Sequence, residues 1–123
     1  MKGFSFLLAL FIAVLSIAGY TYGFCVYNKT SVEIEVTQTA GNRTQRGFWA
    51  RIEPGKHACC NWKNKDCNTG GKRDSIVKFT VTRNDIGGIN WYKTVCRDFP
   101  VKAGGWLEVK KVGDNYFCEA HFK

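Results

Sequence analysis

The chain has 123 residues, with 18 lysine or arginine residues against 10 aspartate or glutamate residues, and a formal net charge of +8 at pH 7. This length suits one folded domain with a modest core and argues against a second domain. The positive charge favours anionic partners such as acidic glycans, phospholipid headgroups or nucleic acid, although it also keeps many secreted proteins merely soluble.

The first 23 residues have the features of a secretory signal peptide. Lys2 supplies a positive charge, residues 4–17 form an almost unbroken apolar run, and small residues follow, so cleavage is expected after Ala18 or after Gly23. The run is shorter than the roughly 20 apolar residues that span a bilayer. We therefore expect this segment to be removed and residues 24–123 to form a secreted, extracellular domain without a transmembrane segment.

All six cysteines lie in this expected mature domain, at Cys25, Cys59, Cys60, Cys67, Cys96 and Cys118. An even number of cysteines in a short secreted chain predicts three disulfides. Two glycosylation sequons, which begin at Asn28 and Asn42, agree with passage through the secretory pathway. We therefore predict a disulfide-stabilised glycoprotein with these two asparagines as glycan acceptors.

The mature domain shows the two-residue periodicity of β-strands. Apolar residues alternate with polar ones at Val32, Ile34 and Val36, and Gly, Pro, Asn and Asp mark turns between such segments. In chain order, the expected extended segments cover residues 24–27, 32–37, 48–52, 77–82, 89–99, 106–112 and 116–122. No segment has the spacing of a capped amphipathic helix. The pattern predicts an all-β, antiparallel β-sandwich of six or seven strands, with a small barrel as the alternative.

Residues 57–75 form a cysteine-rich loop in this prediction. A zinc site that uses His57 and the three cysteines disagrees with the usual ligand spacing and with an oxidising secretory route. A catalytic thiol is disfavoured, because an even number of cysteines leaves none obviously unpaired. We therefore predict a loop pinned by disulfides, with no metal and no cofactor.

Adjacent cysteines rarely bond to each other, so Cys59 and Cys60 need different partners. The preferred pairing joins one of them to Cys67 and the other to Cys96. Cys25 and Cys118 then remain and link the first strand to the last. Six cysteines allow many connectivities, so this pairing is a preference among them.

The pinned loop carries the residues predicted to bind a partner, namely Trp62, Lys63, Lys65, Lys72 and Arg73. A preorganised loop with aromatic and basic side chains is a good recognition surface, because little entropy is lost on binding. The alternative is a solvated basic loop in which Trp62 folds over the disulfide.

Four segments of the chain carry a family resemblance: CVYNKT, PGKHACCNWKNKDCN, GKRDSIVKF and VKAGGWLEV. They resemble small secreted cysteine-rich proteins of fungi, in particular the effector candidates of root-colonising symbionts. The resemblance spans most of the mature domain. It implies an extracellular, non-enzymatic, disulfide-stabilised domain, and it supplies no catalytic residues.

The sequence has no nucleophile elbow, no zinc-protease motif and no phosphate-binding glycine loop. Glu33 and Glu35 share one face of a strand, and their alternation places them in solvent. Trp49 and Trp106 are out of phase with their apolar neighbours, which predicts exposed aromatic rings that can stack on sugars or dock on proteins. We predict a monomeric, non-enzymatic protein that binds at a cell surface, cell wall or host interface.

The expected partner is an extracellular glycan or a host protein, and anionic surfaces are a further option. Two alternative functions remain at this point: a lectin-like binder of cell-wall polysaccharide, and a cationic membrane-active or antimicrobial protein. The second lacks an amphipathic membrane-binding helix. The signal peptide argues against a nucleic-acid partner.

Overall fold

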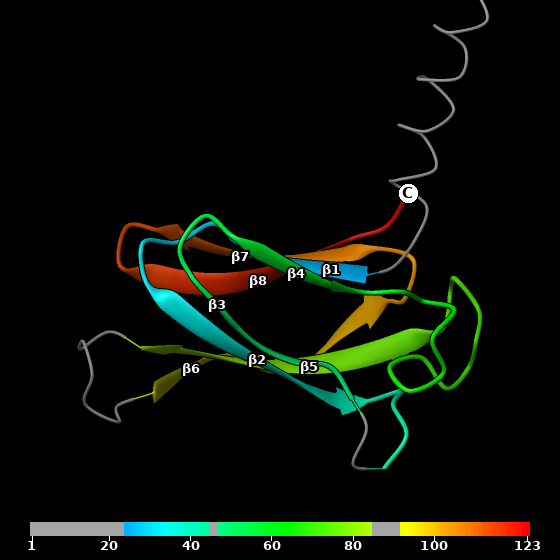
Figure 1. The fold of residues 1–123 in the computed structure, drawn as a ribbon. Coiled ribbons are helices and arrows are strands. Elements are labelled where there is room, and N and C mark those ends of the chain that lie inside the picture. The colour runs from blue at the N-terminus through cyan, green and yellow to red at the C-terminus, as the bar shows by residue number, and fades with distance from the viewer. Residues whose placement is uncertain (1–23, 45–46, 85–91) are drawn as a thin grey trace, which may run out of the picture.

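The structure, a computed structural model, describes residues 24–44, 47–84 and 92–123, and the predicted signal peptide lies outside these ranges. Its eight strands form two layers (Figure 1). They are β1 (Phe24–Asn28), β2 (Glu33–Ala40), β3 (Trp49–Ile52), β4 (His57–Cys60), β5 (Ile76–Asn84), β6 (Tyr92–Lys102), β7 (Trp106–Val112) and β8 (Asn115–His121). The all-β prediction is confirmed, with one strand more than expected. No helix among the described residues is long and apolar enough to cross a bilayer.

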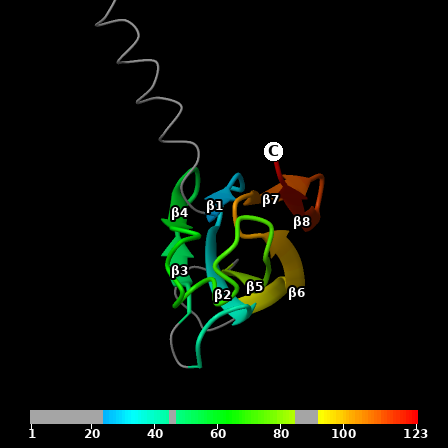
Figure 2. The same cartoon turned by 90° about the vertical axis from the view of Figure 1, so that its right-hand side faces the viewer.

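Each layer is a four-stranded sheet. The first has the order β4-β1-β7-β8 and the second the order β3-β2-β5-β6. Neighbours are antiparallel except β1 and β7, which run parallel, so the purely antiparallel prediction needs this correction. The edge strands β3 and β4 lie on the same side of the sandwich (Figure 2).

Strand β4 is the element that the sequence analysis missed. The segment His57–Cys60 was expected in a loop, but it pairs with β1 in a register that places Cys59 opposite Cys25. Its residues, HACC, show no contrast between apolar and polar positions. The strand is therefore defined by its partner β1 and not by its own periodicity.

The core lies between the sheets and is built from the alternating apolar residues. Ile34, Val36 and the β5 residues Val77, Phe79 and Val81 are all fully buried. The rings of Phe24, Phe48 and Phe79 meet at centroid distances of 5.0–6.0 Å. Complete burial of one such side chain stabilises the fold by about 1.5–3 kcal/mol. The predicted two-residue periodicity is confirmed at these positions.

All six cysteines form disulfides, which pair Cys25 with Cys59, Cys60 with Cys67, and Cys96 with Cys118. Two features of the preferred pairing are confirmed: Cys59 and Cys60 have different partners, and one of them closes a short loop to Cys67. The other two expected bridges, to Cys96 and between the first and last strands, are wrong. Cys25 and Cys59 face each other across the β1–β4 ladder with Cα atoms 4.0 Å apart, so their pairing follows from the unpredicted strand.

Asn28 ties the end of β1 to two other parts of the fold. Its side-chain Nδ2 donates hydrogen bonds to the carbonyl oxygens of Val32 (2.8 Å) and Ile52 (2.9 Å). Its Oδ1 accepts from the backbone amide (3.0 Å) and the hydroxyl (2.7 Å) of Thr30. Asn28 is only 1 % exposed. The sequence Asn28-Lys29-Thr30 therefore builds a buried turn, and a glycan on Nδ2 is incompatible with these contacts.

Substitution Asn28→Ala should lower the free energy of unfolding by about 2–4 kcal/mol, because it leaves buried carbonyl and amide groups without partners. Urea unfolding of the oxidised protein measures this change. Asn42→Ala is the matched control, since the Asn42 side chain makes an exposed hydrogen bond to the neighbouring Arg43 carbonyl. Its cost should stay below about 0.5 kcal/mol. Equal losses in the two variants would contradict the structural role of Asn28.

Candidate functional site

The predicted binding loop follows β4, and Trp62 anchors it to the domain. The Trp62 side chain is half-buried and packs against the core. Its backbone carbonyl accepts a hydrogen bond from Nδ2 of the fully buried Asn68 (2.8 Å), which also donates to the Lys72 carbonyl (3.0 Å). The Lys63 ammonium lies 5.7 Å from the centre of the Trp62 ring. These contacts favour the interpretation in which Trp62 packs within the loop.

The remaining predicted residues differ from Trp62 in their exposure and contacts. Lys65 and Lys72 are exposed. The Arg73 guanidinium lies 4.7 Å from the centre of the Phe122 ring and donates to the Lys123 carbonyl, so Arg73 contacts the C-terminal segment. The loop thus presents exposed lysines, while its tryptophan and arginine make contacts within the domain.

Trp49 lies at the start of the edge strand β3 and is 56 % exposed, as its phase in the sequence indicated. Its indole Nε1 donates to Glu35 Oε1 (3.2 Å) on the neighbouring strand β2. Glu35 Oε2 lies 3.5 Å from Arg51 Nε, and the Arg51 guanidinium is 5.8 Å from the centre of the Trp49 ring. We call Trp49, Glu35 and Arg51 the Trp49 platform: an exposed ring with a carboxylate and a guanidinium beside it.

A cleft of about 500 Å³ adjoins this platform, where the edges of the two sheets meet. Its lining combines apolar, sulfur-containing and polar groups from β3, β4 and the cysteine-rich loop, among them Trp49, Ala50, Ala58, Cys60, Asn64 and Asp66. The Cys60–Cys67 disulfide lies in this lining and links β4 to the loop. An aromatic wall with a few hydrogen-bonding groups is typical of small-ligand sites.

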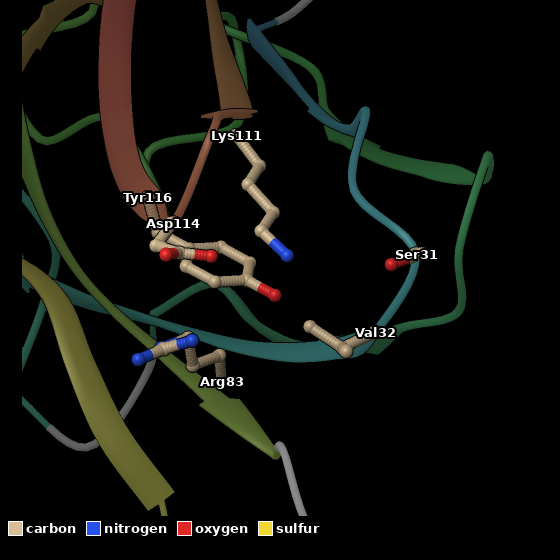
Figure 3. Close-up of a pocket in the computed structure, with 6 residues that line it drawn as sticks. All are labelled: Ser31, Val32, Arg83, Lys111, Asp114 and Tyr116. Atoms are coloured by element: carbon tan, nitrogen blue, oxygen red, sulfur yellow. The ribbon is translucent and has the colours of Figure 1, made fainter.

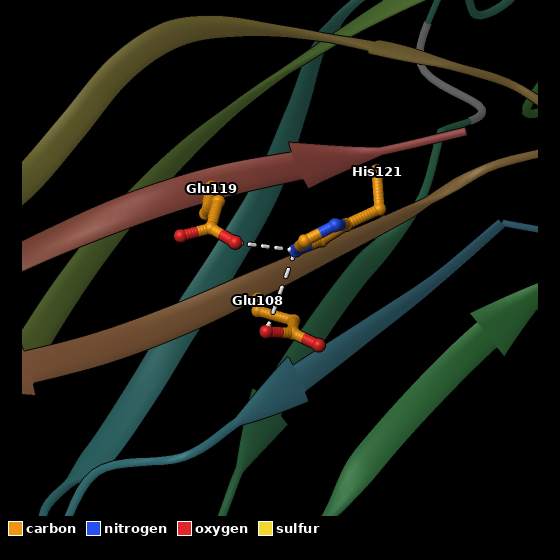
Figure 4. Close-up of side chains that lie close together, drawn as sticks. All are labelled: Glu108, Glu119 and His121. Atoms are coloured by element: carbon orange, nitrogen blue, oxygen red, sulfur yellow. Dashed lines mark ion pairs between the residues drawn. The ribbon is translucent and has the colours of Figure 1, made fainter.

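A separate polar cluster lies on the first sheet and was missed by the sequence analysis. The register of β7 and β8 places Trp106 opposite His121 and Glu108 opposite Glu119. His121 Nε2 is 2.7 Å from Glu119 Oε1 and 3.5 Å from Glu108 Oε2 (Figure 4). The Trp106 ring stacks on His121 with centroids 5.0 Å apart and its Nε1 donates to Glu108 Oε1 (3.3 Å), so half-buried Trp106 supports this cluster.

Two lysines neutralise the carboxylates of this cluster. Lys29 Nζ lies 3.0 Å from one oxygen of Glu108, and Lys110 Nζ lies 3.0 Å from the other and 3.4 Å from Glu119 Oε1. Burial raises the pKa of Glu108, but hydrogen bonds from Lys110, Lys29 and Trp106 outweigh it and lower the pKa to about 2. The Lys110 pKa is raised by its hydrogen bond to Glu108.

Glu108, Glu119 and His121 offer three ligand atoms within 4.8 Å of one another, a set that could hold a metal ion. Such an ion would compete with the Lys110 ammonium, which contacts both carboxylates. The contacts therefore favour an ion-pair network that stabilises the β7–β8 hairpin. Its sequence signal was the alternation of Trp106, Glu108 and Lys110, which places all three on one face of a strand.

No protein-family model and no curated protein sequence matches the chain.

The Glu108 contacts predict a loss of stability in acid. Because the folded-state pKa of about 2 lies below the ordinary value of 4.5, this contribution is fully present above about pH 4.5 and is lost as the pH falls towards 2. Substitution Glu108→Gln should cost about 1–3 kcal/mol at pH 7 and flatten this part of the pH profile.

Urea unfolding between pH 2 and pH 7 measures both effects. Glu53→Gln, at an exposed turn position, is the control and should cost less than about 0.5 kcal/mol at pH 7. An unchanged acid profile in Glu108→Gln would contradict the role given to this network.

Proposed function

We propose that the protein is a secreted, non-enzymatic binding protein that acts at a cell surface, cell wall or host interface, and that the Trp49 platform and its cleft bind carbohydrate. The exposed position of Trp49 beside a lined cleft is the observation that carries this proposal. Three disulfides fit an oxidising, extracellular environment. The resemblance to effector candidates of root-colonising fungi supports the host-interface setting.

The chemistry of the platform suits a sugar ring. The apolar face of a pyranose can stack on the Trp49 indole, while its hydroxyl groups lie within reach of charged and amide side chains. Glu35 already holds the indole by a hydrogen bond to Nε1, so little side-chain freedom remains to be lost on binding. Asn64 and Asp66, on the loop side of the cleft, offer hydrogen-bonding groups to the same ligand.

The exposed lysines of the cysteine-rich loop suggest a secondary, charge-based contribution. Lys65 and Lys72 are exposed on a segment whose backbone is fixed by the Cys60–Cys67 disulfide and by Asn68. Attraction of exposed lysines to anionic surfaces is screened by salt, whereas stacking on an aromatic ring is affected far less. Salt dependence therefore separates the two contributions.

Binding of the oxidised mature protein to chitin and to β-glucan, at low and at high salt, tests the proposal. Retention on one of these polysaccharides should persist at high salt, and Trp49→Ala should weaken it by roughly tenfold or more. Val112→Ala is the matched control, because Val112 is also apolar and is 67 % exposed on β7. Its binding should equal that of the unaltered protein.

Two results would overturn the carbohydrate proposal. The first is retention on neither polysaccharide, which would favour a protein partner. The second is binding that disappears at high salt and is indifferent to Trp49→Ala, which would assign the interaction to the loop lysines. Circular dichroism of Trp49→Ala before and after heating shows whether the fold is intact in the variant.

A further inference from the structure

The cleft beside Trp49 has an apolar floor. Ala50 on β3 and Ala58 on β4 both line the cleft, are half-buried and pack against the core. Ala50 lies two residues before the buried Ile52, so both side chains are on the inward face of β3. The alanine side chains are too small to close the space between the two edge strands, and a cleft of about 500 Å³ remains there.

The loop side of the cleft is polar. Asn64 Oδ1 accepts a hydrogen bond from the backbone amide of Asp66 (3.0 Å), and Asp66 Oδ1 lies 3.6 Å from Arg43 Nη1. These contacts restrain the two side chains, and the Cys60–Cys67 disulfide restrains the backbone that carries them. The cleft can therefore offer a ligand a carboxylate acceptor from Asp66 and an amide donor from Asn64 Nδ2, next to its apolar floor.

A second hollow, beside Tyr116, has a different character (Figure 3). It measures about 380 Å³ and shares no lining residue with the cleft. Half of its six lining residues are charged, namely Arg83, Lys111 and Asp114. The Arg83 guanidinium carbon lies 3.9 Å and the Lys111 ammonium nitrogen 5.2 Å from the centre of the Tyr116 ring. A ligand with an apolar group therefore suits the cleft better than this hollow.

An acetamido group matches both sides of the cleft. Its methyl group suits a floor of alanine side chains, its N–H can donate to a carboxylate, and its carbonyl oxygen can accept from a side-chain amide. A hydroxyl group at the same position of a sugar leaves the apolar floor uncovered. The loss of one methylene from an apolar pocket typically changes affinity by about 10-fold to 200-fold, so the cleft should discriminate between the two substituents.

We propose that the cleft recognises the acetamido group of a 2-acetamido sugar while the Trp49 ring stacks on the same saccharide. This inference rests on the carbohydrate binding proposed for the Trp49 platform, and it specifies the class of sugar. A chain of N-acetylglucosamine units is thus preferred to a chain of glucose units with the same linkage.

Nuclear magnetic resonance titration of the ¹⁵N-labelled, oxidised mature protein with chitotetraose and with cellotetraose tests the inference. The two tetramers share their linkage and differ in the substituent at the second carbon of each ring. Chitotetraose should bind at least about tenfold more tightly. Its shift changes should be saturable and should map to residues 47–50, 58–60 and 64–67, and not to residues 111–116 beside the second hollow.

Substitution Ala58→Val tests the apolar floor. The added methyl groups occupy the space assigned to the acetamido methyl, so the preference for chitotetraose should fall to less than about threefold, while cellotetraose still binds. Ala120→Val is the matched control, since Ala120 is exposed on β8, away from the cleft. It should change neither affinity by more than about twofold.

Substitution Asp66→Ala tests the polar side of the cleft. It removes the charged acceptor and should weaken chitotetraose binding by about tenfold. Arg43→Gln is its control, because it removes the ion pair and keeps the Asp66 carboxylate. The affinity of this control for chitotetraose should change by less than about threefold.

The possible failures separate this inference from the carbohydrate proposal. Equal binding of the two tetramers, lost in Trp49→Ala, would overturn the acetamido preference and leave carbohydrate binding at Trp49 standing. Binding of neither tetramer would overturn both. A chitotetraose preference that survives Ala58→Val and Asp66→Ala, or that maps to residues 111–116, would place the recognition outside the cleft and overturn this inference.

Discussion

The disulfide between Cys96 on β6 and Cys118 on β8 is the one that joins the two sheets in the part of the chain that the structure describes. A domain of this size buries only a modest apolar core, so cross-links that restrict the unfolded chain, typically by about 2–4 kcal/mol each, are a large part of its net stability. The Cys25–Cys59 bridge holds the edge strand β4 on β1, and Cys60–Cys67 extends this restraint into the loop. Both the cleft beside Trp49 and the spacing of the two sheets depend on these links.

Three polar surfaces of the domain differ in how far their groups already satisfy one another. At the Glu108 cluster, each carboxylate oxygen of Glu108 meets a lysine ammonium, so its charge is compensated within the protein. At the Trp49 platform, the glutamate and the arginine compensate each other and leave the indole face exposed. In the hollow beside Tyr116, the Arg83 guanidinium and the Lys111 ammonium both lie against the Tyr116 ring. The first surface therefore stabilises the fold, and the exposed indole of the second is the basis of the proposed carbohydrate binding.

Much of the fold was predictable from residue alternation, as in Ile34 and Val36 or in Val77, Phe79 and Val81, because one face of each strand is buried. Strand β4 was not predictable, because HACC shows no alternation of apolar and polar residues. The wrong disulfide partners followed from the omission of this strand. The Asn28 sequon shows a different limit of the sequence. The same three residues fit both a glycan acceptor and a buried turn, and only the burial of Asn28 distinguishes the two roles. The Glu108 cluster needed the β7–β8 register, which alternation within one strand does not supply. The outward phase of Trp49, by contrast, was visible in the sequence.

Disulfide mapping of the oxidised protein by mass spectrometry, after tryptic digestion without reduction, tests the account most directly. The structure predicts that residues 94–97 are linked to residues 112–123 and to no other peptide. It also predicts one set of three linked peptides, joined through Cys25–Cys59 and Cys60–Cys67. These are the peptide ending at Lys29, residues 57–63 and residues 66–72. A link between the peptides of Cys25 and Cys118 would contradict the strand pairing of β1 with β4, and with it the cleft and the arrangement of the two sheets.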